Sequence, residues 1–367
     1  MTEAVYIHIP FCQTHCPYCD FAVWLDPKGK KFEAYTAALC EEIAKRAQGE
    51  RLETIYFGGG TPSILPLFLL KKLFERLHSS FVINPQTEIT LEVNPGTVNK
   101  EKLLAFKSLG INRLSLGVQS FDQNLLRKLA RLHSGEDAIN LIQAAQNAGF
   151  DNLSLDLIYG LPKQTVDQWA NTLDQALELN IQHISCYSLT IEENTPFKKM
   201  YVDLSYPELP TEDNLCAMYE ILQQKTKAKG FIQYEVSNFA KAGFQSRHNL
   251  TYWHNQEFYG FGVSAHEFRQ GKRLAHSRDL DAYINNPLEQ TELDCDLALE
   301  EIMLRLRLKE GIDLDDYKMR FGIDLWERKQ GLLEDYLKRG LIELNGKQLN
   351  LTEAGFLLST HLIAQLT

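Results

Sequence analysis

The feature that most constrains the fold is a regular alternation of short apolar segments with longer amphipathic segments over the first 240 residues. We expect strands at residues 5–9, 54–57, 88–93, 113–118, 153–158 and 183–188, with a weaker seventh at 234–236. We expect helices at residues 32–46, 67–77, 100–109, 136–148, 166–179 and 214–229. Strands that alternate with helices pair in parallel through right-handed crossovers, so the pattern predicts an α/β fold closed as a complete (β/α) barrel or as a partial (β/α)6 barrel. A doubly wound open sheet is the alternative.

The pattern changes near residue 294. Helices are expected at 297–308 and 332–338, a hairpin at 341–344 and 349–351, and a last helix after Thr352. The hairpin prediction depends on Asn345-Gly346, because this pair between two alternating apolar runs is typical of a two-residue β-turn. We therefore predict three parts: a barrel over residues 1–240, a barrel-closing segment over 241–293, and a winged-helix-like domain over 294–367.

The composition is that of a folded globular protein. Of 367 residues, 44% are hydrophobic and 23% are charged, which excludes disordered and fibrous classes. The formal net charge is −10, from 38 basic and 48 acidic residues, and it disfavours nucleic acid as a partner, since such binders usually present a basic face. The chain has neither a recognisable secretory leader nor an apolar run of membrane-spanning length, so we expect a cytoplasmic protein.

Three of the seven cysteines form a compact motif. Cys12, Cys16 and Cys19 have the spacing C-x3-C-x2-C directly after the first expected strand. Three thiolates so spaced can hold three irons of a [4Fe–4S] cluster and leave the fourth iron open to chelate S-adenosylmethionine (SAM). A zinc site completed by His8 or His15 is the alternative.

The other four cysteines are scattered through the sequence. They are Cys40, Cys186, Cys216 and Cys295. An odd number of cysteines without a leader is typical of a reducing compartment, where thiols serve as metal ligands. We expect these four to be packed side chains without a role in the cluster.

Glycine and polar residues gather where the expected strands end. They are Gly58, Gly59, Gly60 and Thr61 after the second strand, Glu92 and Asn94 at the third, Gln119 at the fourth and Asp156 within the fifth. The carboxyl ends of parallel barrel strands share one face, so these residues predict one site. The glycines free backbone N–H groups for a ligand, Glu92 suits its cationic amino group or ribose hydroxyls, and Arg131 could pair with its carboxylate.

Together these motifs resemble the radical SAM superfamily, which is defined by a three-cysteine loop after the first strand of a partial barrel. Further matches to its oxygen-independent coproporphyrinogen III oxidase-like group are YIHIPFC at 6–12, YCDF at 18–21, FGGGTP at 57–62, LEVNP at 91–95, GVQS at 117–120 and DLIYGLP at 156–162. The resemblance covers nearly the whole chain. It implies SAM contacts at Tyr6, Tyr18, Gly59, Gly60, Thr61, Glu92, Gln119, Arg131 and Asp156.

Two features favour the heme chaperone branch of this group over its decarboxylase branch. The decarboxylases typically have a fourth cysteine two residues beyond the third, where this chain has Asp20-Phe21. Residues 247–253 (RHNLTYW) match the H-N-x-x-Y-W motif of the chaperone branch. One departure from the group is the loop at 263–267 (VSAHE), where relatives more often have a glycine-richer stretch that ends in His-Ser.

The motif suggests a heme site. His248 could offer an imidazole to the heme iron, while Tyr252 and Trp253 offer flat faces to the porphyrin. Alternatively, the histidine holds a loop through hydrogen bonds and the two aromatic residues belong to the core. His254 and His266 are alternative ligands.

The resemblance therefore implies a heme chaperone that binds heme, a [4Fe–4S] cluster and SAM. It would deliver heme to heme-dependent proteins such as respiratory enzymes, as a monomer or homodimer, with the cluster and SAM regulating transfer. No catalytic residue is predicted on this interpretation, and whether SAM is turned over stays open. The alternative is an enzyme, coproporphyrinogen III dehydrogenase, which removes carbon dioxide from two propionates through a 5′-deoxyadenosyl radical. A third class, tRNA modification, is disfavoured by the acidic charge.

Overall fold

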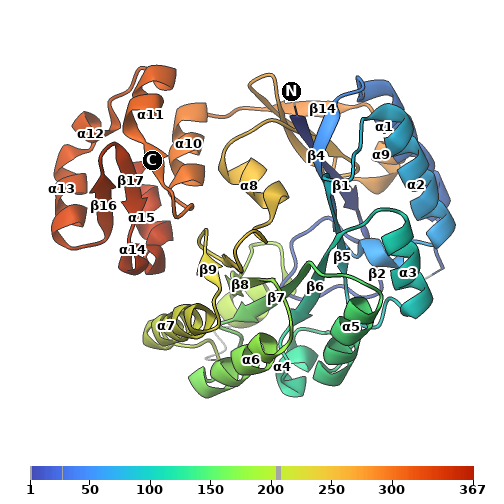
Figure 1. The fold of residues 1–367 in the computed structure, drawn as a ribbon, viewed down its shortest axis with the longest axis horizontal. Coiled ribbons are helices and arrows are strands. Elements are labelled where there is room, and N and C mark those ends of the chain that lie inside the picture. The colour runs from blue at the N-terminus through green and yellow to red at the C-terminus, as the bar shows by residue number, and fades with distance from the viewer. Residues whose placement is uncertain (1, 27, 204–207) are drawn as a thin grey trace.

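The main unit is built on one large open sheet (Figure 1). The computed structural model describes residues 2–26, 28–203 and 208–367. Within them, twelve strands form one sheet in the order β14 (Gln290–Leu293), β13 (Lys272–His276), β12 (His266–Arg269), β11 (Phe258–Phe261), β1 (Thr2–Ile9), β4 (Arg51–Gly59), β5 (Glu88–Val93), β6 (Arg113–Gln119), β7 (Leu153–Tyr159), β8 (His183–Ser188), β10 (Asn238–Ala240) and β9 (Ile232–Gln233). The strands from β11 to β8 are parallel, and the two end strands do not pair with each other. The predicted partial barrel is confirmed.

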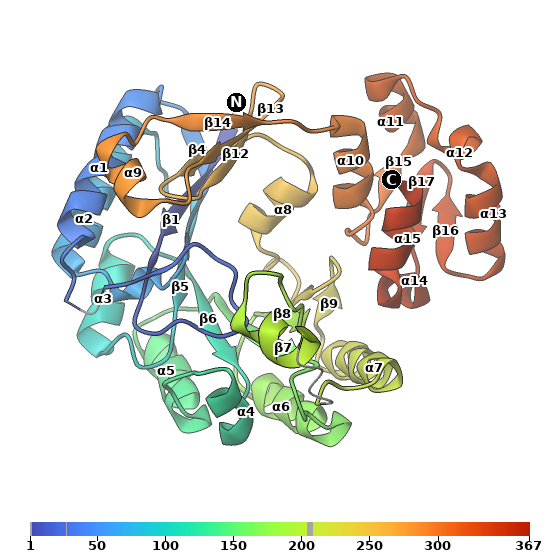
Figure 2. The ribbon, with the colours of Figure 1, turned by 180° about the vertical axis from the view of Figure 1, so that it is seen from behind.

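Helices cover the outer face of this sheet (Figure 2). They are α1 (Phe32–Arg46), α2 (Leu67–Ser80), α3 (Lys100–Ser108), α4 (Gln123–Lys128), α5 (Gly135–Asn147), α6 (Val166–Glu178) and α7 (Glu212–Ala228). Helix α6 shows how the sequence specifies them. Thr165 caps its start by accepting a hydrogen bond from the Gln168 N–H, and buried Trp169 and Leu173 recur one turn apart on the face toward the sheet. All six predicted barrel helices are confirmed.

The predicted seventh strand at 234–236 is wrong. Those residues form the connection between β9 and β10, and β10 pairs antiparallel with β8 at the sheet edge. The physical reason is Glu235, whose buried carboxylate accepts a hydrogen bond from the Ser237 N–H at 3.0 Å and stabilises a turn. The apolar character of this segment reflects burial and not an extended strand.

The segment after β10 returns to the opposite end of the sheet. It contains α8 (Arg247–Trp253), then β11 to β13, α9 (Leu280–Asn285) and β14. Strand β11 pairs with β1, and β12, β13 and β14 extend the sheet outward from β11 in antiparallel pairs. Helix α8 lies on the inner side of the sheet, opposite the layer of outer helices (Figure 1). This places α8 where it can contact a ligand held inside the barrel.

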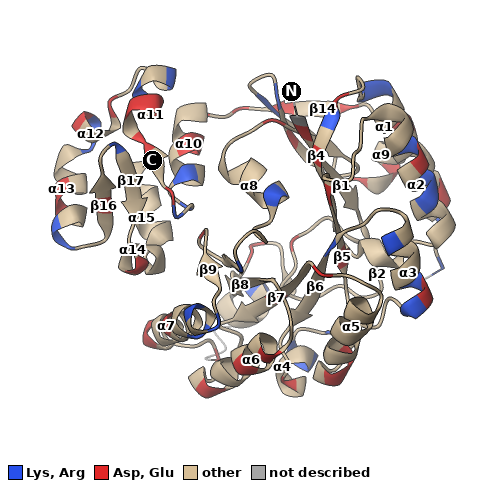
Figure 3. Ribbon diagram, in the orientation of Figure 1, with Lys and Arg blue, Asp and Glu red and all other residues tan. Residues whose placement is uncertain are grey.

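The C-terminal unit combines helices with a small sheet. Its elements are α10 (Leu297–Arg305), β15 (Ile312–Asp313), α11 (Leu314–Phe321), α12 (Leu325–Arg328), α13 (Gln330–Lys338), β16 (Ile342–Asn345), β17 (Gln348–Leu351), α14 (Glu353–Leu357) and α15 (Ser359–Leu366). The predicted hairpin is confirmed, with Gly346 at the positive φ of 65° that its turn requires. Strand β15, which was not expected, adds a third strand beside β17. Acidic and basic residues are interspersed on helices α10 to α13 (Figure 3).

Backbone hydrogen bonds join the two units. The Val236 N–H donates to the Arg307 carbonyl at 3.0 Å, and the Lys309 N–H donates to the Tyr234 carbonyl at 2.9 Å. The turn that replaces the predicted seventh strand is therefore the attachment point of the C-terminal unit. Among the described residues, no helix combines the length and the apolar character needed to cross a membrane.

Candidate functional site

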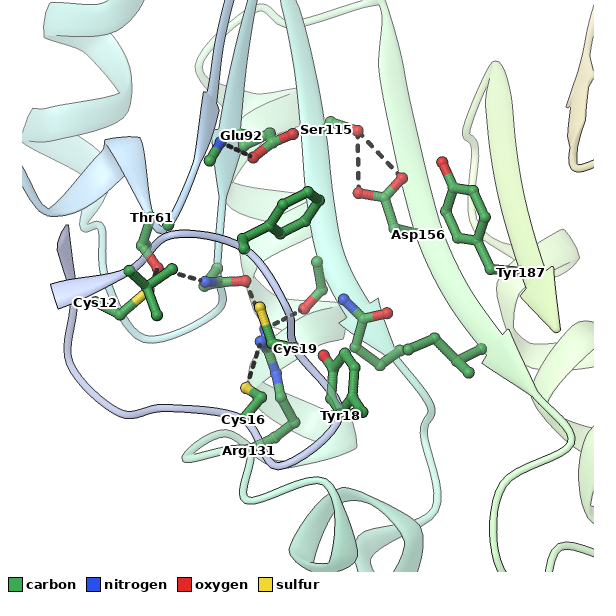
Figure 4. Close-up of a pocket in the computed structure, with 18 of the residues that line it drawn as sticks. Cys12, Cys16, Tyr18, Cys19, Thr61, Glu92, Ser115, Arg131, Asp156 and Tyr187 are labelled. Carbon is green, nitrogen blue, oxygen red and sulfur yellow. Dashed lines mark hydrogen bonds between the residues drawn. The ribbon is translucent and has the colours of Figure 1, made fainter. Parts of the chain in front are cut away.

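The three motif cysteines line one cavity inside the barrel (Figure 4). Cys12 ends β2 (Phe11–Cys12), which pairs with β3 (Trp24–Leu25), and Cys16 and Cys19 follow on the loop between these strands. The cavity has a volume of about 670 Å³, and residues from several strand ends line it with the cysteines. The predicted convergence of the loops at one site is therefore observed.

The chemistry of the three sulfur donors suits an iron–sulfur cluster. Burial, together with the two other thiols, raises the pKa of Cys12 to about 11, and burial also raises the pKa of Cys19. These thiols carry protons at neutral pH, so cluster binding must displace them. The two histidines of the zinc alternative have other partners, since His8 Nε2 lies 3.0 Å from the Ala22 carbonyl and His15 Nε2 lies 3.3 Å from the Cys19 carbonyl.

A chain of polar contacts begins at Cys12. The Asn94 amide donates to Thr61 Oγ1 at 2.9 Å, so the Thr61 hydroxyl proton is free to point at Cys12 Sγ, 3.4 Å away. The Asn94 Oδ1 atom of the same side chain accepts a hydrogen bond from the Arg131 guanidinium at 2.5 Å. Asn94 therefore ties the loop after β4 to Arg131.

Arg131 completes this chain at the second cysteine. Its guanidinium also donates to the Gly117 carbonyl at 2.6 Å and lies 3.7 Å from Cys16 Sγ. A cation beside a cluster ligand favours the thiolate form and stabilises the negative charge of a bound cluster. Arg131, the predicted partner of the SAM carboxylate, is thus held rigidly beside the cysteine loop.

The glycine loop lets the backbone approach its neighbours closely. Gly59 has a φ of 110°, and a Cβ there would lie 2.6 Å from the His8 ring. A Cβ on Gly60 would lie 2.8 Å from the carbonyl oxygen of Phe11. Any side chain at either position would displace the chain that leads into the cysteine loop, so both positions require glycine.

Two half-buried carboxyl groups line the cavity, Glu92 from β5 and Asp156 from β7, with β6 between these strands. Burial, with a contribution from the Asp156 charge, raises the pKa of Glu92 to about 8, although Tyr56 and the Gly59 N–H donate to it at 2.9 and 3.2 Å. Burial likewise raises the pKa of Asp156 to about 6, while the Ser115 hydroxyl lies 3.1 and 3.2 Å from its two oxygens. A cationic ligand in this cavity would favour the ionised form of both groups.

The predicted SAM contacts come together with one exception. The residues that line the cavity are Tyr18, Gly59, Gly60, Thr61, Glu92, Gln119, Arg131 and Asp156. Tyr6 lies behind the wall, where its ring stacks on Tyr56 with 6.2 Å between centroids. His8 donates from Nε2 to the Ala22 carbonyl at 3.0 Å, so its Nδ1 accepts from the Tyr6 hydroxyl at 3.1 Å. Tyr6 therefore supports the site from outside the cavity.

The motif histidine on α8 does not line the cavity. His248 is fully buried, and its Nδ1 and Nε2 hydrogen bond to the hydroxyls of Thr54 and Tyr252, each at 2.7 Å. Its ring stacks on Tyr56 with 5.1 Å between centroids. Burial, with the Arg113 charge, lowers the pKa of His248 to about 3, so the imidazole is neutral. As placed, it connects α8 to β4.

The other residues proposed for heme lie apart from one another. Trp253 ends α8 half-buried, with the Arg307 guanidinium 5.6 Å from its ring centroid. His254 hydrogen bonds to Glu310 at the junction with the C-terminal unit. His266 is exposed on β12. The structure does not gather these side chains around one ligand.

Several residues of the cavity wall were not predicted from the sequence. They are Tyr56, Arg113, Ser115, His133, Ser185, Tyr187 and Asn249. Arg113 and Ser115 lie in β6, four and two residues before Gly117, so the alternation of side chains along a strand was an available signal for them. Asn249 comes from α8, which the sequence gave no reason to place inside the barrel.

Comparison with known proteins identifies the family. Residues 6–176 match the radical SAM superfamily and residues 295–358 match the HemN C-terminal domain. The chain is 38% identical to the heme chaperone HemW of Bacillus subtilis over 370 residues, which cover 97% of each chain. It belongs to the HemW family of radical SAM proteins. It is also 36% identical to HemW of Escherichia coli, over 84% of this chain and 83% of that one.

The fold of this HemW-family chain has a solved counterpart. The coproporphyrinogen III oxidase HemN of Escherichia coli, described as a radical SAM enzyme, superposes with a TM-score of 0.86 at 23% identity, over 100% of this chain and 90% of that one. This similarity shows a shared fold. Membership of the radical SAM superfamily implies a [4Fe–4S] cluster and SAM, which the cysteine loop and its cavity fit.

Proposed function

We propose that the protein is a heme chaperone that binds heme and passes it to heme-dependent proteins. The observation that carries this proposal is the 38% identity to the heme chaperone HemW of Bacillus subtilis over 97% of both chains. The absence of a cysteine at Asp20-Phe21, directly after the triad, supports the same conclusion. We propose that it acts in the cytoplasm, where thiols stay reduced, with respiratory enzymes among its recipients.

We propose Cys12, Cys16 and Cys19 as the cluster ligands. A [4Fe–4S] cluster with an open iron binds SAM and can transfer one electron to it. Around it, Arg131 would pair with the SAM carboxylate, Glu92 with its amino group or ribose, and the glycine loop would contribute N–H donors. Tyr18, Thr61, Gln119 and Asp156 would complete the SAM site, with Tyr6 behind it. The division of the chain near residues 240 and 293 also stays a proposal.

For heme, we propose α8 as the binding element, with His248, Tyr252 and Trp253 as its candidates. Direct ligation by His248 requires one of its two buried hydrogen bonds to open, at a cost of about 1–3 kcal/mol for the partner left unsatisfied. Iron–imidazole bonding is strong enough to offset that cost. The alternative role, in which His248 only anchors α8, makes a different prediction for mutants.

A pair of assays on the anaerobically reconstituted protein tests the function. The protein is titrated with hemin, and separately incubated with coproporphyrinogen III, SAM and a reductant. We expect saturable hemin binding and no protoporphyrinogen. Formation of protoporphyrinogen with repeated turnover would instead establish the coproporphyrinogen III dehydrogenase function.

A matched pair of variants tests His248. His248→Ala removes the imidazole, whereas Thr54→Val removes the partner of Nδ1 and leaves the imidazole in place. If His248 binds the iron, hemin affinity falls in His248→Ala and is retained or raised in Thr54→Val, and the absorption spectrum of the bound hemin changes only in the former. Undiminished hemin affinity in His248→Ala would remove this residue from the ligand set.

A further inference from the structure

The cavity extends beyond the predicted SAM contacts to a second group of polar side chains. These are Arg113 and Ser115 of β6, Tyr187 of β8 and Asn249 of α8. Arg113, Tyr187 and Asn249 carry N–H or O–H donors. Donors gathered in one part of the cavity suit an anionic ligand group.

Arg113 is a buried cation without a bonded partner. Its side chain is only 2% exposed, and its guanidinium makes no hydrogen bond or ion pair with any residue that the structure describes. Its charge acts on the carboxyl groups of Glu92 and Asp156, but it forms no hydrogen bond or ion pair with either of these two described residues. Burying a guanidinium without a partner is unfavourable, and a bound anion would offset that cost.

Arg131 does not share this property. It donates to the Asn94 side chain and to the Gly117 carbonyl, and it lies beside Cys16. The two arginines thus differ in their contacts. Hydrogen bonds from the protein fix Arg131 at the cysteine loop, whereas Arg113 lines the cavity without a hydrogen-bond partner among the described residues.

The two arginines approach the cavity from different positions along β6. Arg113 begins β6, and Gly117, which Arg131 contacts, lies four residues further along the same strand, about 13 Å at 3.3 Å per residue. A SAM carboxylate paired with Arg131 would lie at the cysteine end of this strand. A carboxylate of another molecule would then be available to Arg113.

We propose that Arg113 binds a carboxylate of a second ligand, which enters the cavity on the side of α8. This inference rests on the proposed heme function, and it identifies that carboxylate as a propionate of heme. Arg113 matches a carboxylate through two parallel N–H donors, and Asn249 on the adjoining wall belongs to the same helix as His248. The propionate subsite would place heme between α8 and the SAM cavity.

Esterification of the propionates tests the proposal. Reconstituted wild type, Arg113→Gln and Arg113→Lys are titrated with hemin and with hemin dimethyl ester in the same detergent, and with SAM. Arg127→Gln is the matched control, because Arg127 is exposed on helix α4, outside the cavity, and its side chain hydrogen bonds to Asn124. We expect Arg113→Gln to weaken hemin binding about tenfold, as the loss of a charge-assisted pair would. The dimethyl ester should bind wild type and Arg113→Gln alike.

The outcomes separate this inference from the proposed function. Wild type that binds hemin and its ester equally, or Arg113→Gln that loses SAM affinity while it keeps hemin affinity, would overturn the propionate assignment. Coproporphyrin III, which has four propionates and no iron, is the second probe. If wild type binds no hemin but binds coproporphyrin III through Arg113, the carboxylate subsite stands without the heme function; if it binds neither, both fail. Arg113→Lys keeps the cavity charge, so intermediate hemin affinity and a wild-type unfolding curve would exclude misfolding as the cause.

Discussion

Replacing Gly117 by alanine should disrupt the contacts that hold Arg131 at the cysteine loop. A Cβ on Gly117 would lie 2.4 Å from Asn94 Oδ1 and 3.3 Å from Arg131 Nη2. The Asn94 side chain would have to move, which breaks its 2.5 Å bond from Arg131 and disturbs its 2.9 Å bond to Thr61. Loss of one charge-assisted hydrogen bond costs about 1.5–3 kcal/mol and overpacking about 1–3 kcal/mol. Partial relaxation leaves an expected loss of about 2–4 kcal/mol in the free energy of unfolding.

The assay compares urea unfolding and SAM affinity in Gly117→Ala and in a control with the same chemical change. Gly331 lies in helix α13 with nothing within 4 Å of an added Cβ, so Gly331→Ala should be neutral or stabilising by up to about 1 kcal/mol. SAM binding should weaken in Gly117→Ala, because Arg131 loses its orientation, and should be unchanged in Gly331→Ala. Wild-type stability together with wild-type SAM affinity in Gly117→Ala would refute the proposed contact chain.

Two further predictions concern the cavity. Because burial raises the pKa of Glu92 to about 8, the folded chain binds a proton that the unfolded chain releases near 4.5, so Glu92 lowers stability progressively as the pH rises from about 4.5 to 8. Glu92→Gln without SAM should therefore gain stability over wild type as the pH is raised from 5 to 8, and parallel urea-midpoint curves for the two proteins would contradict the raised pKa. Cys16→Ser should lose the iron content and broad visible absorption of the reconstituted cluster, while Cys216→Ser, outside the cavity on α7, should keep both; full iron content in Cys16→Ser would exclude it as a ligand.

The sequence specified the regular part of the fold well. The bounds of α1 were predicted without error, because an apolar stripe at helical spacing has only one good interpretation over fifteen residues. The strands β11 to β14 were missed because each is four or five residues long and owes its pairing to the neighbouring strand. Pairing between segments that are distant in the chain produces little recognisable pattern in the local sequence. The opposite error occurred at residues 234–236, where a buried segment was predicted to be a strand and is not one.

The predicted part of the site was that carried by motifs. Thr61, Glu92 and Arg131 stand in recognisable sequence contexts, and the structure brings them to one cavity. Arg113 has no such context. Its proposed role depends on its burial at the cavity without a hydrogen-bond partner among the described residues. No pattern in the sequence encodes that an arginine is left unpaired.

The H-N-x-x-Y-W segment has a structural reason to exist that is independent of heme. His248 bridges the Thr54 and Tyr252 hydroxyls, and its ring stacks on Tyr56. Tyr56 in turn donates to Glu92, so one side chain contacts both the motif helix and the proposed SAM site. These contacts stabilise the fold whether or not His248 binds a heme iron. For that reason Thr54→Val is the decisive partner of His248→Ala: it weakens the structural bridge and leaves the imidazole available.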